Sequence, residues 1–267
     1  MNLTALTPCC VDHYPQLQKS FMGGNSLNVA SMWKYLNPDA NVSVITCLGN
    51  DPSGEMIHSY LTKKGIDVSR VYVKEGSTAS NQLRVDEHGE RFGIEGTWRG
   101  GLYETFHLSE DDWTFVAQQD VIAMPANNPN FTEMVKRKHS KQVLVVDYLD
   151  VDNTIPIEKT IEYTDIAFIT ARIGVLKKYQ ELASASGKLL VVTLGADGSY
   201  AFHNNAMYHQ SAIPIPYVVD TTGCGDAYQA AFALKYMQTV NITESMNAGA
   251  EAASRIAQAW GGVGKIE

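Results

Sequence analysis

The chain lacks the features that membrane and secreted proteins need. Among its 267 residues no apolar run reaches the roughly 18 that a membrane span requires, and no signal-peptide pattern precedes Pro8. Its four cysteines lack zinc-site or disulfide-framework spacing; they are Cys9, Cys10, Cys47 and Cys224. We therefore expect no membrane partner and a reducing, cytoplasmic location.

Positive charge is also scarce. The chain has 21 Lys and Arg against 29 Asp and Glu, which gives a net charge of −8 and argues against a nucleic-acid partner. Any anionic ligand must therefore be held by a local group of donors. The Gly23-Gly24-Asn25 segment lacks Gly-x-Gly-x-x-Gly spacing, so a nicotinamide-dependent enzyme is not expected.

The most informative segment is Asp-Thr-Thr-Gly-Cys-Gly-Asp at residues 220–226, which we call the nest. An apolar run follows, so the pattern predicts a strand end, a glycine turn and a helix. The first N–H groups of a helix are unpaired and carry the positive end of its dipole, so such a turn can bind an anion. Asp226 beside it suits a base for a hydroxyl that attacks a phosphoryl group. An ordinary loop with Asp226 as helix cap is the alternative.

Short β-branched runs alternate with helical stretches along the chain. Buried strands are expected at residues 42–46, 121–124, 143–146, 166–170 and 189–194, and helices at 54–64, 130–139, 175–185, 227–237 and 244–259. This alternation predicts one α/β domain over residues 1–267, with a doubly wound, mostly parallel sheet and helices on both faces. Residues 82–92 instead alternate at period two around a glycine turn, which predicts a hairpin outside that sheet.

Three segments in order resemble the signatures of the ribokinase-like (PfkB) carbohydrate kinases. The nest is similar to that family's Asp-Thr-x-Gly-Ala-Gly-Asp, with Cys224 in the alanine position. Residues 23–30 are similar to its Gly-Gly-x-x-x-Asn segment, and residues 192–198 to its nucleotide-side turn. Residues 10–17, Cys-Val-Asp-His-Tyr-Pro-Gln-Leu, further resemble the fructoselysine 6-kinase branch. The resemblance covers nearly the whole chain.

The resemblance implies a kinase that uses ATP and Mg²⁺ to phosphorylate a hydroxyl of a sugar or sugar-amine, with a fructoselysine-like ketosamine favoured. It implies that Asp226 is the base and that Gly223, Cys224 and Gly225 supply N–H donors to the phosphoryl group. It also implies a small β lid, formed by about residues 13–22 and 80–97, through which two subunits could pair as a homodimer. A surface hairpin with no role is the alternative.

The remaining site residues follow from the same motifs. Sugar hydroxyls are expected at Asp12, Gly24, Asn25 and Asn28, with Arg91 reaching substrate or phosphate from the lid. Asp12 is expected at a strand end and Asn28 early in a helix, both at the carboxyl rim of the sheet. ATP phosphates are expected at Thr193, Gly195 and Gly198. Asp220 could help to bind a monovalent cation such as K⁺.

One departure from the family pattern bears on metal binding. The usual Asn-x-x-Glu reads Thr170-Ala171-Arg172-Ile173, so the glutamate that would orient hydrated magnesium is absent. Magnesium would then depend on ATP phosphates, water and Asp147. A kinase for another sugar or a nucleoside, or a sugar- or nucleotide-binding protein without catalysis, therefore stays open. The presence of Asp226 favours an enzyme, because a binding protein needs no base there.

Overall fold

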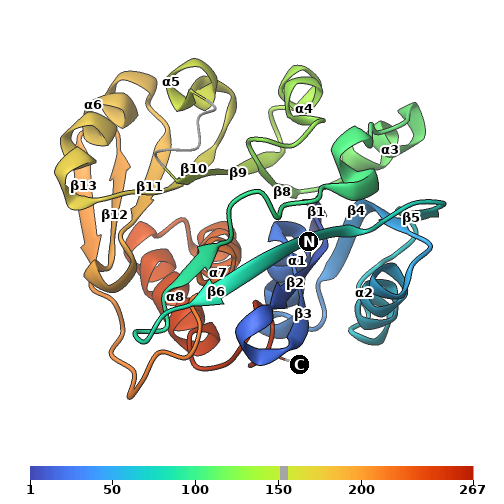
Figure 1. The fold of residues 1–267 in the computed structure, drawn as a ribbon. Helices are drawn as coiled ribbons and strands as arrows, with labels where there is room; N and C mark the ends of the chain where they lie inside the picture. Colours follow the sequence, from blue (N-terminus) through green and yellow to red (C-terminus); the bar gives the residue numbers. More distant parts are fainter. Residues whose placement is uncertain (151–155, 267) are drawn as a thin grey trace.

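The computed structural model describes residues 1–150 and 156–266. Within them, nine strands form one large sheet in the order β13-β12-β11-β10-β9-β8-β1-β4-β5 (Figure 1). Its strands are β1 (Asn2–Leu6), β4 (Asn41–Gly49), β5 (Val71–Lys74), β8 (Val121–Pro125), β9 (Val143–Asp150), β10 (Ile166–Thr170), β11 (Leu189–Thr193), β12 (Ser199–His203) and β13 (Ala206–Gln210). Neighbours pair in parallel except at β11–β12 and β12–β13, so the predicted mostly parallel sheet is confirmed.

Helices cover both faces of this sheet (Figure 1). One face carries α1 (Asn25–Leu36), α2 (Pro52–Lys63), α7 (Cys224–Thr239) and α8 (Ile242–Ile256), and the other carries α3 (Glu110–Val116), α4 (Phe131–Arg137), α5 (Ile157–Thr160) and α6 (Leu176–Ser186). Alternate strand residues enter separate cores, as Val191 packs on one side and Val192 on the other. Burial on both faces explains the continuous apolar runs of the predicted strands.

Short 3₁₀ helices complete the regular structure of the described residues; they are η1 (Pro15–Leu17), η2 (Gly101–Thr105), η3 (Ile161–Tyr163), η4 (Ile173–Val175) and η5 (Gly195–Asp197). The predicted C-terminal boundary of the last helix is wrong. It ends at Ile256, and Ala257 then accepts a hydrogen bond from Val219 N at 2.7 Å. Residues 257–266 turn back beside the nest instead of extending the helix. No helix in the described ranges has the length and apolar character to cross a membrane.

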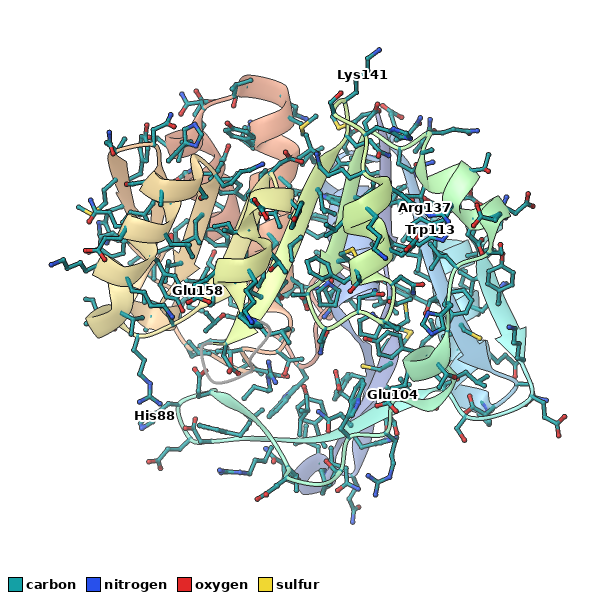
Figure 2. The ribbon with its side chains drawn as sticks, turned by 90° about the horizontal axis from the view of Figure 1, so that it is seen from above. His88, Glu104, Trp113, Arg137, Lys141 and Glu158 are labelled. Carbon is teal, nitrogen blue, oxygen red and sulfur yellow. The ribbon has the colours of Figure 1, made fainter. Side chains whose placement is uncertain are left out.

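A second, four-stranded sheet stands apart from the first and resembles the expected lid, although it begins at Cys10 and not at residue 13. Its order is β3-β2-β6-β7, with β2 (Cys10–Tyr14), β3 (Lys19–Gly23), β6 (Ala79–Val85) and β7 (Arg91–Gly93). The two central strands, β2 and β6, are parallel, and the outer pairs are antiparallel. Figure 2 shows His88 at the outer end of the β6–β7 hairpin. The lid therefore combines an N-terminal hairpin with the predicted one.

Candidate active site

Asp226 lies in the first turn of α7 and is held by two amides of α1. Asn25 Nδ2 donates to Asp226 Oδ1 at 2.7 Å, and Asn28 Nδ2 donates to Oδ2, also at 2.7 Å. Burial raises the pKa of Asp226 above its ordinary value, while the two amides and Arg91 oppose that rise. A fixed carboxylate with a raised pKa is a stronger general base than an exposed aspartate.

The two amide groups that hold Asp226 also keep free acceptors. Asn25 Oδ1 and Asn28 Oδ1 are buried and have no hydrogen-bond partner within the described part of the chain. Buried acceptors without partners are costly, so a hydroxyl-rich ligand that donates to them would gain affinity. The expected sugar residues Asn25 and Asn28 are thus brought to the expected base.

Glycines 23 and 24 allow the lid to join α1 at close quarters. Gly24 has φ +94°, and a Cβ there would lie 2.6 Å from Pro8 O. A Cβ on Gly23 would lie 2.2 Å from Asp12 Oδ2. Larger residues would displace either the chain or the Asp12 carboxylate, so the Gly-Gly pair leaves room for a polar group of the site.

Asp12 was expected at a strand end, and that placement is wrong. It lies in the middle of β2, paired with Phe21 of β3 and Asn81 of β6, so it belongs to the lid sheet. Its side chain is 6% exposed. Burial, reinforced by the charges of Asp220 and Asp226 and opposed by Arg91, raises the pKa of Asp12 to about 7. The carboxyl group therefore changes charge near neutral pH.

The nest has the predicted form, a glycine turn that opens α7. Gly223 has φ +77°, and a Cβ there would lie 2.6 Å from Gly262 Cα, so this glycine packs against the chain. The N–H of Cys224 donates to Thr221 O at 3.2 Å within the turn, so this N–H already has a hydrogen-bond partner. No heavy atom of another part of the described chain lies within 4 Å of a Cβ built on Gly225. Of the three residues, Gly225 thus faces open space.

The first aspartate of the nest, Asp220, is completely buried. Its Oδ1 accepts from Thr222 N at 2.9 Å, and its Oδ2 accepts from Gly261 N at 2.9 Å and from the Tyr14 hydroxyl at 2.7 Å. The sequence analysis missed Tyr14 and Gly261. These contacts join residues 206 and 41 positions apart, and no local pattern encodes such pairings.

The tip of the lid hairpin docks on the nest. Thr221 N donates to Gly89 O at 3.0 Å, and Arg91 N donates to Thr221 Oγ1 at 2.9 Å. A Cβ on Gly89, whose φ is +82°, would lie 2.6 Å from a Val218 methyl group. Arg91 lowers the pKa of both Asp12 and Asp226 through its charge.

The expected nucleotide-side residues lie at the end of β11 and in the turn after it. Thr193 ends β11, with its hydroxyl 3.1 Å from that of Thr170 on β10. Gly195 has φ +60° and open space where a Cβ would be. Gly198 has φ +88°, and a Cβ there would lie 2.3 Å from Gln210 O. Gly195 can therefore admit a ligand, whereas Gly198 is required by the turn.

Asp147 is a further acidic residue close to Asn25 and Asp226. It lies in β9, where Leu149 N donates to its Oδ1 at 2.8 Å and Asn25 Nδ2 lies 3.5 Å from its Oδ2. Burial and the neighbouring Asp226 raise its pKa to about 6. The described residues hold no cluster of three His, Cys, Asp or Glu side chains fit for a metal ion, and Ile173 is exposed. This donor set fits a magnesium ion bound mainly by phosphate and water.

A family model described as "pfkB family carbohydrate kinase" matches residues 7–266, and the chain belongs to this family of carbohydrate kinases. It is 28% identical over 263 residues to the fructoselysine 6-kinase of Shigella flexneri, covering 97% of this chain and 98% of that one.

Two solved structures share the fold. Arabidopsis thaliana ribokinase complexed with ribose and ATP has a TM-score of 0.82 at 22% identity, covering 97% of this chain and 93% of that one. Vibrio cholerae fructokinase, solved with fructose, ADP and potassium bound, has a TM-score of 0.80 at 16% identity, covering 100% and 95%.

Proposed function

We propose that this carbohydrate kinase transfers a phosphoryl group from ATP to a hydroxyl of a ketosamine such as fructoselysine. The observation that carries the proposal is Asp226, a partly buried carboxylate fixed by Asn25 and Asn28 at the opening of the α7 nest. The similarity to a fructoselysine 6-kinase over nearly both whole chains supports the substrate class. A cytoplasmic location, with its supply of ATP, is part of this proposal.

In this proposal the acceptor sugar lies between the lid and α1. Asp12 and the free Oδ1 atoms of Asn25 and Asn28 accept hydrogen bonds from its hydroxyls, with Gly24 allowing close approach. Arg91 extends from the lid toward substrate or phosphate. These contacts orient one hydroxyl toward Asp226, which removes its proton as the bond to phosphorus forms.

The phosphoryl donor lies on the other side of Asp226. Thr193, Gly195 and Gly198 form the turn that approaches the ATP phosphates, and Gly223, Cys224 and Gly225 stabilise the charge that develops on the transferring group. When bound, Mg²⁺ would neutralise phosphate charge. Asp147 is the acidic residue placed to bind its water. The N–H of Cys224 can reach the phosphoryl group only if its hydrogen bond to Thr221 O breaks. If that bond persists, the N–H of Gly225 is the donor to the phosphoryl group.

A kinase for another sugar or for a nucleoside remains the second candidate, favoured by the fold shared with ribokinase. A coupled assay of ADP release over fructoselysine, fructose, ribose and adenosine separates the two. We expect kcat/KM for the ketosamine to exceed that for the plain sugars by about 10- to 100-fold, which equals roughly 1.4–2.7 kcal/mol. Equal or better turnover of ribose, fructose or adenosine would contradict the ketosamine proposal. Tight binding without turnover of any acceptor would support loss of catalysis.

A further inference from the structure

We propose that Tyr14 is a positioning residue that holds the nest through Asp220 and Thr222, so that no monovalent cation is needed there. The inference rests on the proposed kinase function, although not on which sugar is the acceptor. It differs from the expectation that Asp220 helps to bind K⁺.

The carboxylate of Asp220 is surrounded by hydrogen-bond donors. Its carboxylate accepts three hydrogen bonds, from Tyr14 Oη at 2.7 Å and from the N–H groups of Thr222 and Gly261 at 2.9 Å each. Bonds to an ionised acceptor are stronger than neutral ones, so three of them compensate much of the cost of burying the charge. A cation needs lone pairs that face it, and of the roughly four acceptor sites of this carboxylate three face O–H and N–H groups, which leaves about one for a cation.

The ring of Tyr14 is held in place by two neighbouring aromatic rings. Tyr14 is fully buried, and its ring meets Phe21 of β3 edge-on at 5.3 Å and Trp260 at 5.7 Å between centroids. Gly261 allows this packing, because a Cβ there would lie 2.8 Å from Phe21 Cβ. The hydroxyl is therefore aimed at Asp220 and at Thr222 Oγ1, which lies 2.8 Å away.

The same strand also sets the sugar side of the site. Residues two apart in a strand face the same side, so Asp12 and Tyr14 of β2 point together toward the site. Thr222, the second partner of the hydroxyl, directly precedes Gly223 and the opening of α7. Tyr14 thus fixes the distance between the acceptor and the amides that meet the phosphoryl group. Such distances control the rate of transfer more strongly than the affinity for either ligand.

Tyr14→Phe removes the hydroxyl and keeps the ring. We expect kcat to fall about tenfold or more, while the KM for sugar and the Kd for ATP change less than about threefold. Thr222→Val should lower kcat similarly, and the two changes together should cost less than the product of the single effects, because they remove one interaction. Additive losses, or wild-type kcat in Tyr14→Phe, would overturn the positioning role.

Tyr72→Phe is the matched control. The Tyr72 hydroxyl also donates to a buried aspartate, Asp112 Oδ1 at 2.7 Å, but it lies on β5 at the far edge of the large sheet. This variant should lose thermal stability and keep wild-type kcat. A kcat loss equal to that of Tyr14→Phe would attribute both effects to general destabilisation and contradict the proposal.

The cation is tested separately by the melting temperature without substrate. A specifically bound ion stabilises the folded state, so we expect the same melting temperature and kcat in KCl and in tetramethylammonium chloride, whose cation is too large for such a site, at equal ionic strength. A higher melting temperature in KCl, or K⁺-dependent turnover, would overturn the proposal that the nest needs no monovalent cation. This melting comparison needs no turnover. It therefore still decides the question if no sugar is phosphorylated, an outcome that would instead count against the proposed function.

Discussion

Asp226 is the residue on which the proposed chemistry depends most. Asp226→Asn keeps the shape of the side chain and still allows contact with Asn25 and Asn28, although one amide must then rotate to offer its oxygen. We expect folding and ATP binding to persist while kcat falls by roughly 10²-fold or more, because the hydroxyl loses its proton acceptor.

The control for Asp226→Asn is the same substitution at an exposed aspartate outside the site. Asp39→Asn removes an exposed carboxylate in the turn before β4, and we expect it to leave kcat unchanged. Steady-state kinetics together with calorimetric titration of ATP separates catalysis from binding. Near wild-type turnover in Asp226→Asn would remove this residue from the role of base.

Asp12 predicts a pH dependence for sugar binding. Its pKa lies at about 7, so the carboxyl group is protonated at lower pH and loses part of its capacity to accept hydroxyl hydrogen bonds. We expect the KM for sugar to rise as the pH falls through about 7, while the KM for ATP stays nearly constant. Asp12→Asn should have a raised KM that no longer changes over this range. If the KM for sugar varied with pH in Asp12→Asn as it does in wild type, another group would be responsible for the titration.

At the scale of elements, Gly223 and Gly225 of the nest have different structural roles. Gly223 has a positive φ and packs on Gly262, so Gly223→Ala should destabilise the fold. Gly225 is in α7 with open space beside it, so Gly225→Ala should hold or raise stability by up to about 1 kcal/mol while kcat falls, because the methyl group enters the phosphoryl site. Thermal melting and kinetics of both variants test this contrast. Wild-type kcat in Gly225→Ala would place the phosphoryl group elsewhere.

Elements with strong local patterns could be predicted from the sequence. The buried strands from β8 to β11 are continuous apolar runs, and the nest combines a glycine turn with the start of a helix, so both followed from residue order alone. Asp12 was misplaced because its short strand reads like a strand end of the main sheet. Tyr14 and Gly261 were missed because their roles arise only when β2 and residues 257–266 meet at Asp220.

For the whole molecule, the buried carboxylates predict how stability varies with pH. Between the ordinary value of 3.8 and its raised pKa of about 7, folded Asp12 holds a proton that the unfolded chain releases. The unfolded state therefore binds fewer protons, and the free energy of unfolding falls as the pH rises across this interval. Asp147, with a pKa of about 6, adds an effect of the same sign.

Asp12→Asn tests this linkage in the protein without ligands. The variant should gain melting temperature relative to wild type at a pH above about 7 and gain less at a pH near 5, where wild-type Asp12 is already neutral. Scanning calorimetry across this range measures the difference. A gain that is the same at both pH values would contradict a raised pKa at Asp12.

The lid edge predicts the state of assembly. β7 (Arg91–Gly93) is an outer strand whose three residues are all exposed, and the Phe92 side chain is 39% exposed. We expect a homodimer that pairs through this lid, with Phe92→Asp shifting it to monomer. Met207→Asp, on β13 at the edge of the main sheet, is the control and should remain dimeric. Light scattering distinguishes these results, and a monomeric wild type would contradict the expectation.

The return of residues 257–266 to the nest also has a consequence for the order of synthesis. Asn28 leaves the ribosome early, but Gly262, which packs against both Asn28 and Gly223, follows only after about 230 more residues. At about 5–20 residues per second, this interval is roughly 10–50 s. During that time a nascent chain can form the lid hairpin and much of the sheet. It cannot complete the packing of Gly262 on Asn28 and Gly223 until the last residues have emerged.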